Sequence, residues 1–149
     1  MLTFREIQAA DRDVVLPMVQ AFYTTDAVDH PVPRDILERS FRDTADPEVK
    51  SLRGVLLLED GAPAGYLYLT SCYSCEVGGE CVFIEELFLT ENCRGKGYGK
   101  QVMDWIMEQY PKVRRLRLEV TQVNQRAVHL YEKCGFKYLR YDQMSFDRV

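Results

Sequence analysis

The chain has 149 residues, of which 46% are hydrophobic and 28% are charged, as in a folded globular domain and unlike a disordered chain. The formal net charge of -4 argues against a protein that binds nucleic acid over its whole surface. No apolar run is longer than that of Val55–Leu58, which is too short to span a bilayer, and the charged N-terminus does not resemble a signal peptide. We therefore expect one cytoplasmic domain over residues 1–149.

Hydrophobic spacing and turn residues predict the elements of the first half of the chain. Alternation predicts a first strand, and a helical pattern opens at Asp11 and contains Pro17. A second helix follows a turn with two prolines, and a hairpin comes next. The predicted ranges are Leu2–Ile7 for the strand, Arg34–Thr44 for the second helix, and Gly54–Glu59 with Ala64–Tyr73 for the hairpin.

The second half of the chain alternates strands with helices. The predicted ranges are a strand over Cys81–Thr90, a helix over Gly99–Tyr110, a strand over Arg115–Thr121, a helix over Asn124–Cys134, and one or two strands in the tail Phe136–Phe146. Because a strand precedes each of the two later helices, a mixed sheet with helices on its faces is the natural packing.

The five cysteines and two histidines give little sign of a metal site. Cys72 and Cys75 form a lone CxxC, for which two interpretations stay open. A zinc or redox site would need a second ligand pair or a thioredoxin-like setting, and the sequence offers neither. The pair is otherwise two reduced thiols near a strand end. We expect no metal cofactor.

A glycine-rich turn joins the strand Cys81–Thr90 to the next helix. Gly95, Gly97 and Gly99 alternate with other residues there, and the turn also carries three cations. Glycine lets the backbone approach a ligand, and free amides at a helix start favour an anion. The turn therefore predicts a phosphate or pyrophosphate site. It fits neither a Walker loop, GxxxxGK followed by Ser or Thr, nor the GxGxxG dinucleotide fingerprint.

Two blocks of residues together resemble the GNAT superfamily of N-acetyltransferases. The first is Arg94-x-x-Gly97-x-Gly99 after the strand segment Glu85–Leu89. The second comprises Leu118–Val120, Asn124, Ala127, Leu130–Lys133 and Gly135–Phe136. The resemblance implies a single-domain GNAT fold of the α/β (α+β) class. Its mixed, mostly antiparallel sheet of six to seven strands has splayed central strands and about four flanking helices.

The resemblance also implies acetyl-coenzyme A as the cosubstrate. The turn would hold the pyrophosphate through backbone amides, and the strand before it would pair with the pantetheine arm. The cofactor-binding residues implied are Leu87, Phe88, Leu89, Arg94, Gly95, Lys96, Gly97, Tyr98, Gly99, Lys100 and Asn124.

The reaction implied is acetyl transfer to a primary amine of a small molecule or peptide, which needs a general base and a general acid. By similarity to the family we choose Glu85 as the base, acting directly or through water. Adjacent strand residues point to opposite faces, so we expect only one of Glu85 and Glu86 to face the cleft. Tyr131 is the candidate acid. The alternatives are strand-end charges for the glutamates and a core position for the tyrosine.

The acceptor site is less well defined by the sequence. Tyr23, His30, Tyr68 and Tyr73 are candidates to line it. The nearby acidic residues Asp26, Asp29, Glu76 and Glu80 would attract a cationic amine. We expect no nucleic-acid or membrane partner and leave a homodimer open. The rival functions are a non-catalytic acyl-coenzyme A sensor or interaction module and a nucleotide-binding domain.

Overall fold

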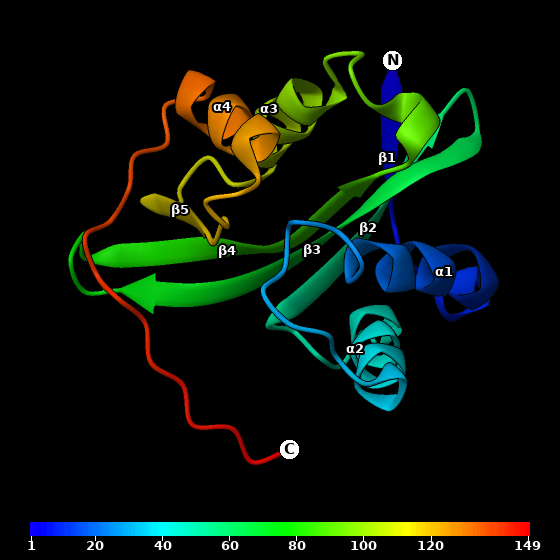
Figure 1. The fold of residues 1–149 in the computed structure, drawn as a ribbon, viewed down its shortest axis with the longest axis horizontal. Helices are drawn as coiled ribbons and strands as arrows, with labels where there is room; N and C mark the ends of the chain where they lie inside the picture. The colour runs from blue at the N-terminus through cyan, green and yellow to red at the C-terminus, as the bar shows by residue number, and fades with distance from the viewer.

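The computed structural model describes residues 1–149 and shows five strands and four α-helices (Figure 1). The elements in chain order are β1 (Leu2–Glu6), α1 (Arg12–Phe22), α2 (Arg34–Ala45), β2 (Leu52–Glu59), β3 (Ala62–Ser74), β4 (Gly79–Leu89), α3 (Tyr98–Gln109), β5 (Arg115–Leu118) and α4 (Gln125–Lys133). Short 3-10 turns at Ala9–Asp11 and Glu91–Cys93 precede α1 and the glycine turn. None of the helices is long and apolar enough to cross a membrane.

The strands form one sheet in the order β1-β2-β3-β4-β5. Neighbouring strands are antiparallel except β4 and β5, which run parallel. The registered pairing of β4 with β5 ends at Ile84 and Leu118, although β4 continues to Leu89. The last five residues of β4 therefore have no β5 partner, which is the splay that the family resemblance predicts.

Helices cover both faces of the sheet (Figure 1). On one face, α3 packs Val102, Met103 and Ile106 against apolar residues of the central strands. On the other face, α1 and α2 pack around Tyr66 and Tyr68 of β3. Each face thus has its own apolar core, which explains why β3 is buried continuously over its central part and does not alternate between buried and exposed.

A β-bulge interrupts the pairing of β3 with β4. Tyr68 pairs with Glu86 and Leu69 with Ile84, which leaves Glu85 without a partner. The extra residue changes which side chains face which core. Ile84 lies in the core beneath α3, whereas Phe88, also an even position, lies in the core beneath α1. The bulge sits at the point where β4 separates from β5.

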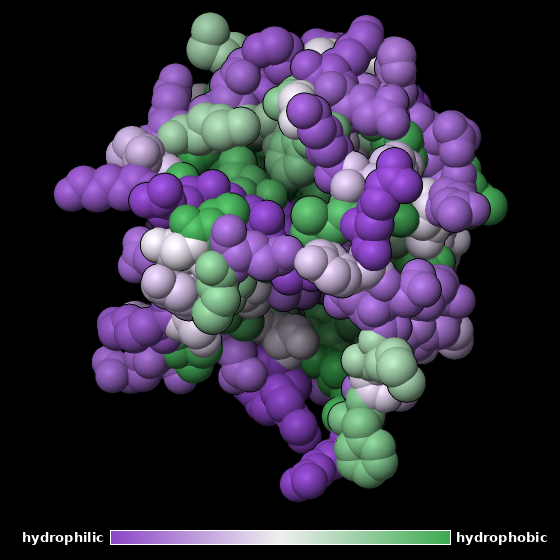
Figure 2. All heavy atoms as spheres, turned by 90° about the vertical axis from the view of Figure 1, so that its left-hand side faces the viewer, coloured by the Kyte–Doolittle hydropathy of each residue, from purple (hydrophilic) through white to green (hydrophobic).

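The strands predicted for the tail are wrong. Residues 136–149 form no strand, so the sheet has five strands and not six to seven. Tyr138 and Tyr141 are exposed, and a hydrogen bond from the Tyr141 hydroxyl to Glu76 ties the tail to the turn between β3 and β4. The free edge of β5 is only four residues long, so a strand formed by the tail could make few backbone hydrogen bonds with it. Figure 2 faces this end of the molecule, which is largely hydrophilic with apolar patches between.

The other predicted elements are present with shifted ends. The predicted helices Gly99–Tyr110 and Asn124–Cys134 are found as α3 and α4, and Pro17 lies inside α1 without ending it. The strand predicted over Arg115–Thr121 is shorter, because the chain leaves the sheet after Leu118.

Candidate active site

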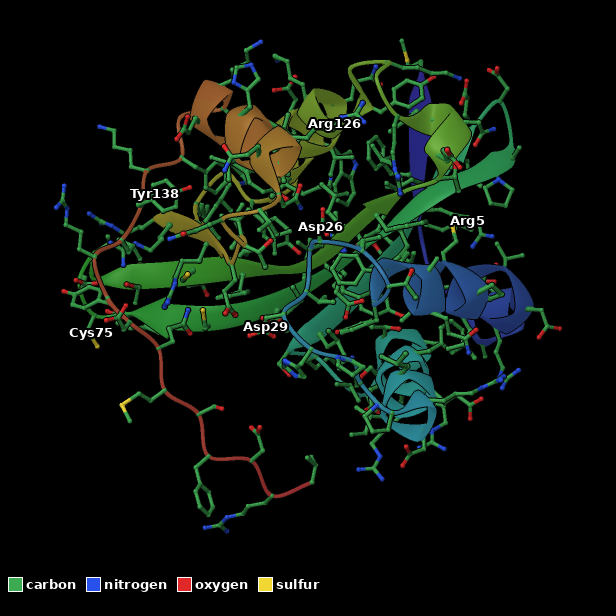
Figure 3. The ribbon with its side chains drawn as sticks, in the orientation of Figure 1. Arg5, Asp26, Asp29, Cys75, Arg126 and Tyr138 are labelled. Atoms are coloured by element: carbon green, nitrogen blue, oxygen red, sulfur yellow. The ribbon has the colours of Figure 1, made fainter.

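A cavity of about 1080 Å³ opens where β4 and β5 separate. Its walls come from the α1–α2 loop, the unpaired part of β4, the glycine turn, the segment after β5, and α4. The Thr121 hydroxyl donates a hydrogen bond to the Asp26 carbonyl and so joins the loop to the segment after β5. Figure 3 labels Asp26 on the loop and Arg126 on α4, which contribute to the cavity from separate elements.

The glycine turn brings the start of α3 to this cavity. Gly97 is the N-cap residue of α3 and has a φ of 79°, and Gly95 has a φ of 75°. Residues with a Cβ rarely adopt this left-handed backbone conformation, which explains why glycine occupies both positions. Gly99 has a different role, since a Cβ there would lie 2.6 Å from Cδ2 of Leu130 on α4. The amides at the start of the helix are thus held open to the cavity, where they favour an anion.

Two of the three predicted cations of the turn are paired with carboxylates. Lys96 lies 2.8 Å from Glu59, and Lys100 lies 2.6 Å from Asp104. Lys96 does not line the cavity. The Cys93 thiol also donates to Glu59 at 3.0 Å, and hydrogen bonds from Cys93 and Lys96 lower the pKa of Glu59 to about 2. The Glu59 carboxylate therefore holds the glycine turn in place through Cys93 and Lys96.

Arg94 and Arg126 remain as cations without a carboxylate partner. The Arg94 Nε donates to the Leu89 carbonyl at 3.0 Å, and its guanidinium stacks on Phe88. Arg126 lies at the start of α4, with its guanidinium next to Gly95. Sequence analysis missed Arg126. Its place two residues after Asn124 in the second block was the only available signal.

Asn124 and Tyr131 bring α4 to the cavity. The Asn124 side-chain oxygen accepts from the Ala127 amide and caps the helix, which leaves its amide nitrogen for another partner. Tyr131 packs against Phe136 with ring centroids 5.7 Å apart. Burial raises the pKa of Tyr131 to about 12, so its hydroxyl stays protonated at neutral pH and can donate a hydrogen bond.

Glu85 and Glu86 lie on the same face of the sheet, contrary to the alternation that we expected. The bulge removes that alternation. Glu85 is exposed, lines the cavity and accepts a hydrogen bond from Thr70 at 2.8 Å. Glu86 is partly buried and accepts from Tyr66 at 2.7 Å and from Tyr23 at 3.1 Å.

Glu86 and Tyr23 form a half-buried polar pair that sequence analysis did not identify. Burial raises the pKa of Glu86, while the bonds from the two tyrosines oppose that rise. Burial and the neighbouring Glu86 also raise the pKa of Tyr23. Because Tyr23 lines the cavity, its hydroxyl connects the cavity to the Glu86 carboxylate. The double acidic Glu85–Glu86 sequence was the only signal for this pair.

The four predicted acceptor residues lie in different places. Tyr23 and His30 line the cavity. Tyr68 is 2% exposed in the core beneath α1, and its hydroxyl has no hydrogen-bond partner. Tyr73 is 66% exposed near the β3–β4 turn, outside the cavity. The structure therefore brings two of the four to the site.

The family model described as "Acetyltransferase (GNAT) family" matches residues 16–136. This chain belongs to the GNAT acetyltransferase family. The match contains the glycine turn, the open end of β4 and the whole of α4. No curated protein matches the sequence.

Solved structures share the fold of this acetyltransferase domain. A possible acetyltransferase from Clostridium difficile 630 is 16% identical, with a TM-score of 0.81 over 100% of this chain and 99% of that one. The aminoglycoside N-acetyltransferase AAC(6')-Iy in complex with CoA is 14% identical, with a TM-score of 0.76 over 100% and 96%. The ribosomal-protein-alanine N-acetyltransferase from Brucella melitensis biovar Abortus 2308 is 15% identical, with a TM-score of 0.74 over 99% of both chains.

Proposed function

We propose that this protein transfers the acetyl group of acetyl-coenzyme A to a primary amine of a small molecule or peptide. The observation that carries the proposal is one cavity with both an unpaired strand and an open helix start on its wall, in a chain of the GNAT family. The strand supplies hydrogen-bonding groups for an extended arm, and the helix start favours a phosphate.

The cosubstrate binds along the wall formed by β4, the glycine turn and α4. Amides of Gly95–Lys100 hold the pyrophosphate, and Arg126 adds the nearby positive charge. The backbone of Leu87 pairs with the pantetheine arm as an added strand would, whereas the Leu89 carbonyl already accepts from Arg94. Asn124 contacts the arm through its free amide nitrogen, which leads the thioester toward Tyr131.

A carboxylate on β4 removes the proton of the attacking amine. An amine with a pKa of about 10.4 is mostly protonated at pH 7, and freeing it costs roughly 5 kcal/mol. Glu85 takes this proton directly or through water, because it is exposed to the cavity. Glu86 is the second candidate, and it would receive the proton through the Tyr23 hydroxyl.

Tyr131 supplies a proton at the end of the reaction. The amine nitrogen attacks the carbonyl carbon of the thioester, and the carbon–sulfur bond then breaks. The Tyr131 hydroxyl, protonated at neutral pH, donates to the departing sulfur, whose pKa as a thiol is about 8.5. The tyrosine regains a proton from water before the next turnover.

The acceptor is an amine that carries positive charge in solution. The cavity wall includes Asp26, Asp29, Glu85 and Glu119, which would attract a cation and make its association slower at high salt. Glu76, which we also expected near the acceptor, instead pairs with Arg115 at the β3–β4 turn. Two of the solved neighbours are named as N-acetyltransferases of an aminoglycoside and of a ribosomal-protein alanine. Both named acceptors contain amines. A cytoplasmic location and a homodimer remain predictions.

Ligand binding and thiol release test the proposal together. Acetyl-coenzyme A should raise the Tm of the protein more than ATP or NAD at equal concentration. A panel of polyamines, aminoglycosides, amino acids and peptides should then include an acceptor that causes release of free thiol. Stabilisation by acetyl-coenzyme A without thiol release for any acceptor would favour the non-catalytic sensor. Equal or greater stabilisation by ATP or NAD would contradict the coenzyme A site.

A further inference from the structure

Cys72 and Cys81 lie directly opposite each other on β3 and β4. Opposed residues of antiparallel strands have Cα atoms about 4.5–5.5 Å apart, within the range of about 4.4–6.8 Å that a disulfide needs. Both thiols are free, and the neighbouring Cys72 contributes to the raised pKa of Cys81. The sequence left open whether the CxxC of Cys72 and Cys75 is a reactive pair, but Cys75 lies in the turn beyond the end of β3 and not opposite Cys72.

The two thiols differ in their exposure to solvent. Cys72 is exposed, whereas Cys81 is 1% exposed. They lie toward the turn end of the hairpin, where Figure 3 labels Cys75, beyond the part of the sheet that α1 and α2 cover. A small reagent in solution can therefore reach Cys72 first, and Cys81 lies directly behind it.

Two arginines of β5 flank the buried thiol. Arg115 is paired in register with Cys81, and Arg117 stacks on Phe83, the next residue of β4 on the same face. Their positive charge favours the thiolate form of Cys81, although burial and the neighbouring Cys72 raise its pKa to about 11 overall. The arginines also favour an anionic reagent at this position. Arg115 is paired with Glu76 at 2.9 Å, whereas Arg117 forms no ion pair.

We propose that Cys72 and Cys81 form a thiol–disulfide exchange site that reacts with small anionic disulfides, such as glutathione disulfide. The Cys72 thiolate attacks one sulfur of the reagent and forms a mixed disulfide, and the other sulfur leaves as a thiol. The Cys81 thiolate then attacks the Cys72 sulfur and releases the second thiol. Two protein thiols and one reagent disulfide thus give one cross-strand disulfide and two reagent thiols. This chemistry is independent of acetyl transfer.

The test treats the folded, reduced protein with glutathione disulfide and maps the products by mass spectrometry. Cleavage after Glu76, Glu80 and Glu85 separates a peptide with Cys72 and Cys75 from one with Cys81. The wild-type protein should yield these two peptides linked. The Cys75→Ser variant, in which the neighbouring exposed thiol is removed, should yield the same link.

Two further variants separate the two steps. Cys81→Ser should accumulate the mixed disulfide on Cys72, because the second thiol is missing. Cys72→Ser should leave Cys81 unmodified, because the buried thiol is not reached first. Circular dichroism confirms the fold of each variant. The proposal is overturned if Cys75→Ser abolishes the link, if the link joins Cys72 to Cys75, or if Cys72 stays free in folded Cys81→Ser.

Discussion

The two ends of the cavity are built from different parts of the chain. At the glycine turn, the wall is mainly backbone: the open edge of β4 and the start of α3, with left-handed glycines at 95 and 97. At the end where we propose that the acceptor binds, the wall includes side chains from the α1–α2 loop and from the bulge at Glu85. The first end is encoded within a few consecutive residues, whereas the second depends on residues far apart in the sequence.

This difference decides how each end would tolerate substitution. A residue that supplies backbone geometry is replaceable only by one with the same φ preference, so its variants should lose coenzyme A binding. A residue that supplies a side chain keeps the cavity when it is replaced by a shape-matched residue, so its variants should lose turnover and keep binding.

The largest expected effect is the loss of turnover in Tyr131→Phe. Tyr131 lines the cavity between its two ends. Only the hydroxyl is removed, so the Tm and the coenzyme A affinity should change little. Turnover should fall about 10²- to 10⁴-fold, as expected for loss of a general acid, measured by thiol release. Tyr138→Phe in the exposed tail is the control and should keep full turnover. Near-normal turnover of Tyr131→Phe would show that this tyrosine only packs.

Gly97→Asp tests the backbone end. A side chain with a negative charge would stand at the helix start in a strained φ region, and like charges brought together cost several kcal/mol. Coenzyme A affinity should fall by roughly 100-fold or more, which corresponds to about 2.8 kcal/mol. Gly78→Asp is the matched control, because Gly78 also has a positive φ and open space around it but lies in the β3–β4 turn. Equal affinities in the two folded variants would remove the proposed phosphate site.

Glu85→Gln and Glu86→Gln identify the base at the side-chain end. Loss of the base should reduce turnover by about 10²-fold at low pH, where the amine is most protonated. The defect should shrink as rising pH frees the amine without help. The sequence favours Glu85, and the structure adds Glu86 through the Tyr23 hydroxyl. A defect of Glu85→Gln that is constant with pH would indicate substrate orientation and not proton removal.

The contrast between the ends also explains what the sequence could and could not predict. Local signals placed the glycine turn and the four helices correctly, because each is encoded by neighbouring residues, whereas the splay of β4 from β5 was implied only by the family resemblance. The bulge depends on how β4 pairs with β3, so alternation alone misassigned the faces of Glu85 and Glu86. One or two strands were also predicted in the tail Phe136–Phe146, but the short free edge of β5 does not pair with it.

The charges at the glycine turn also show the difference between what neighbouring residues encode and what depends on the fold. The sequence assigned Lys96 and Lys100 to the phosphate because they lie beside the glycines. Their carboxylate partners, Glu59 and Asp104, come from a different strand and from the next turn of α3. Arg126 is distant in sequence, so its place next to Gly95 could be found only from the fold.

Arg126→Ala should therefore weaken coenzyme A binding more than Lys96→Ala does. Loss of one charge-assisted contact to a phosphate costs about 1.5 kcal/mol, or roughly tenfold in Kd by calorimetry. Lys96→Ala should change Kd less, because that ammonium is already paired with Glu59. The Arg126 effect should also decrease as salt rises. A larger loss in Lys96→Ala would restore the assignment made from the sequence.

The smallest effect concerns stability, and it tests the burial of Glu86. Burial raises the pKa of Glu86 above its ordinary value of 4.5, so the folded protein holds this proton to a higher pH than the unfolded chain does. The folded state then binds more protons between the two pKa values, and the free energy of unfolding decreases as pH rises through that window. Each unit of difference contributes about 1.4 kcal/mol.

Glu86→Gln should remove this decrease, because the amide does not titrate. Loss of a hydrogen bond with Tyr23 or Tyr66 would shift the whole curve of unfolding free energy against pH, but it would not restore the slope. The measurement is urea unfolding from pH 4.5 upward, with the exposed Glu85→Gln as the control. This control should keep most of the wild-type slope, because burial raises the pKa of Glu86 more than the Glu85 charge does. An unchanged slope in Glu86→Gln would mean that water reaches this carboxylate, and the route through Tyr23 would lose its physical basis.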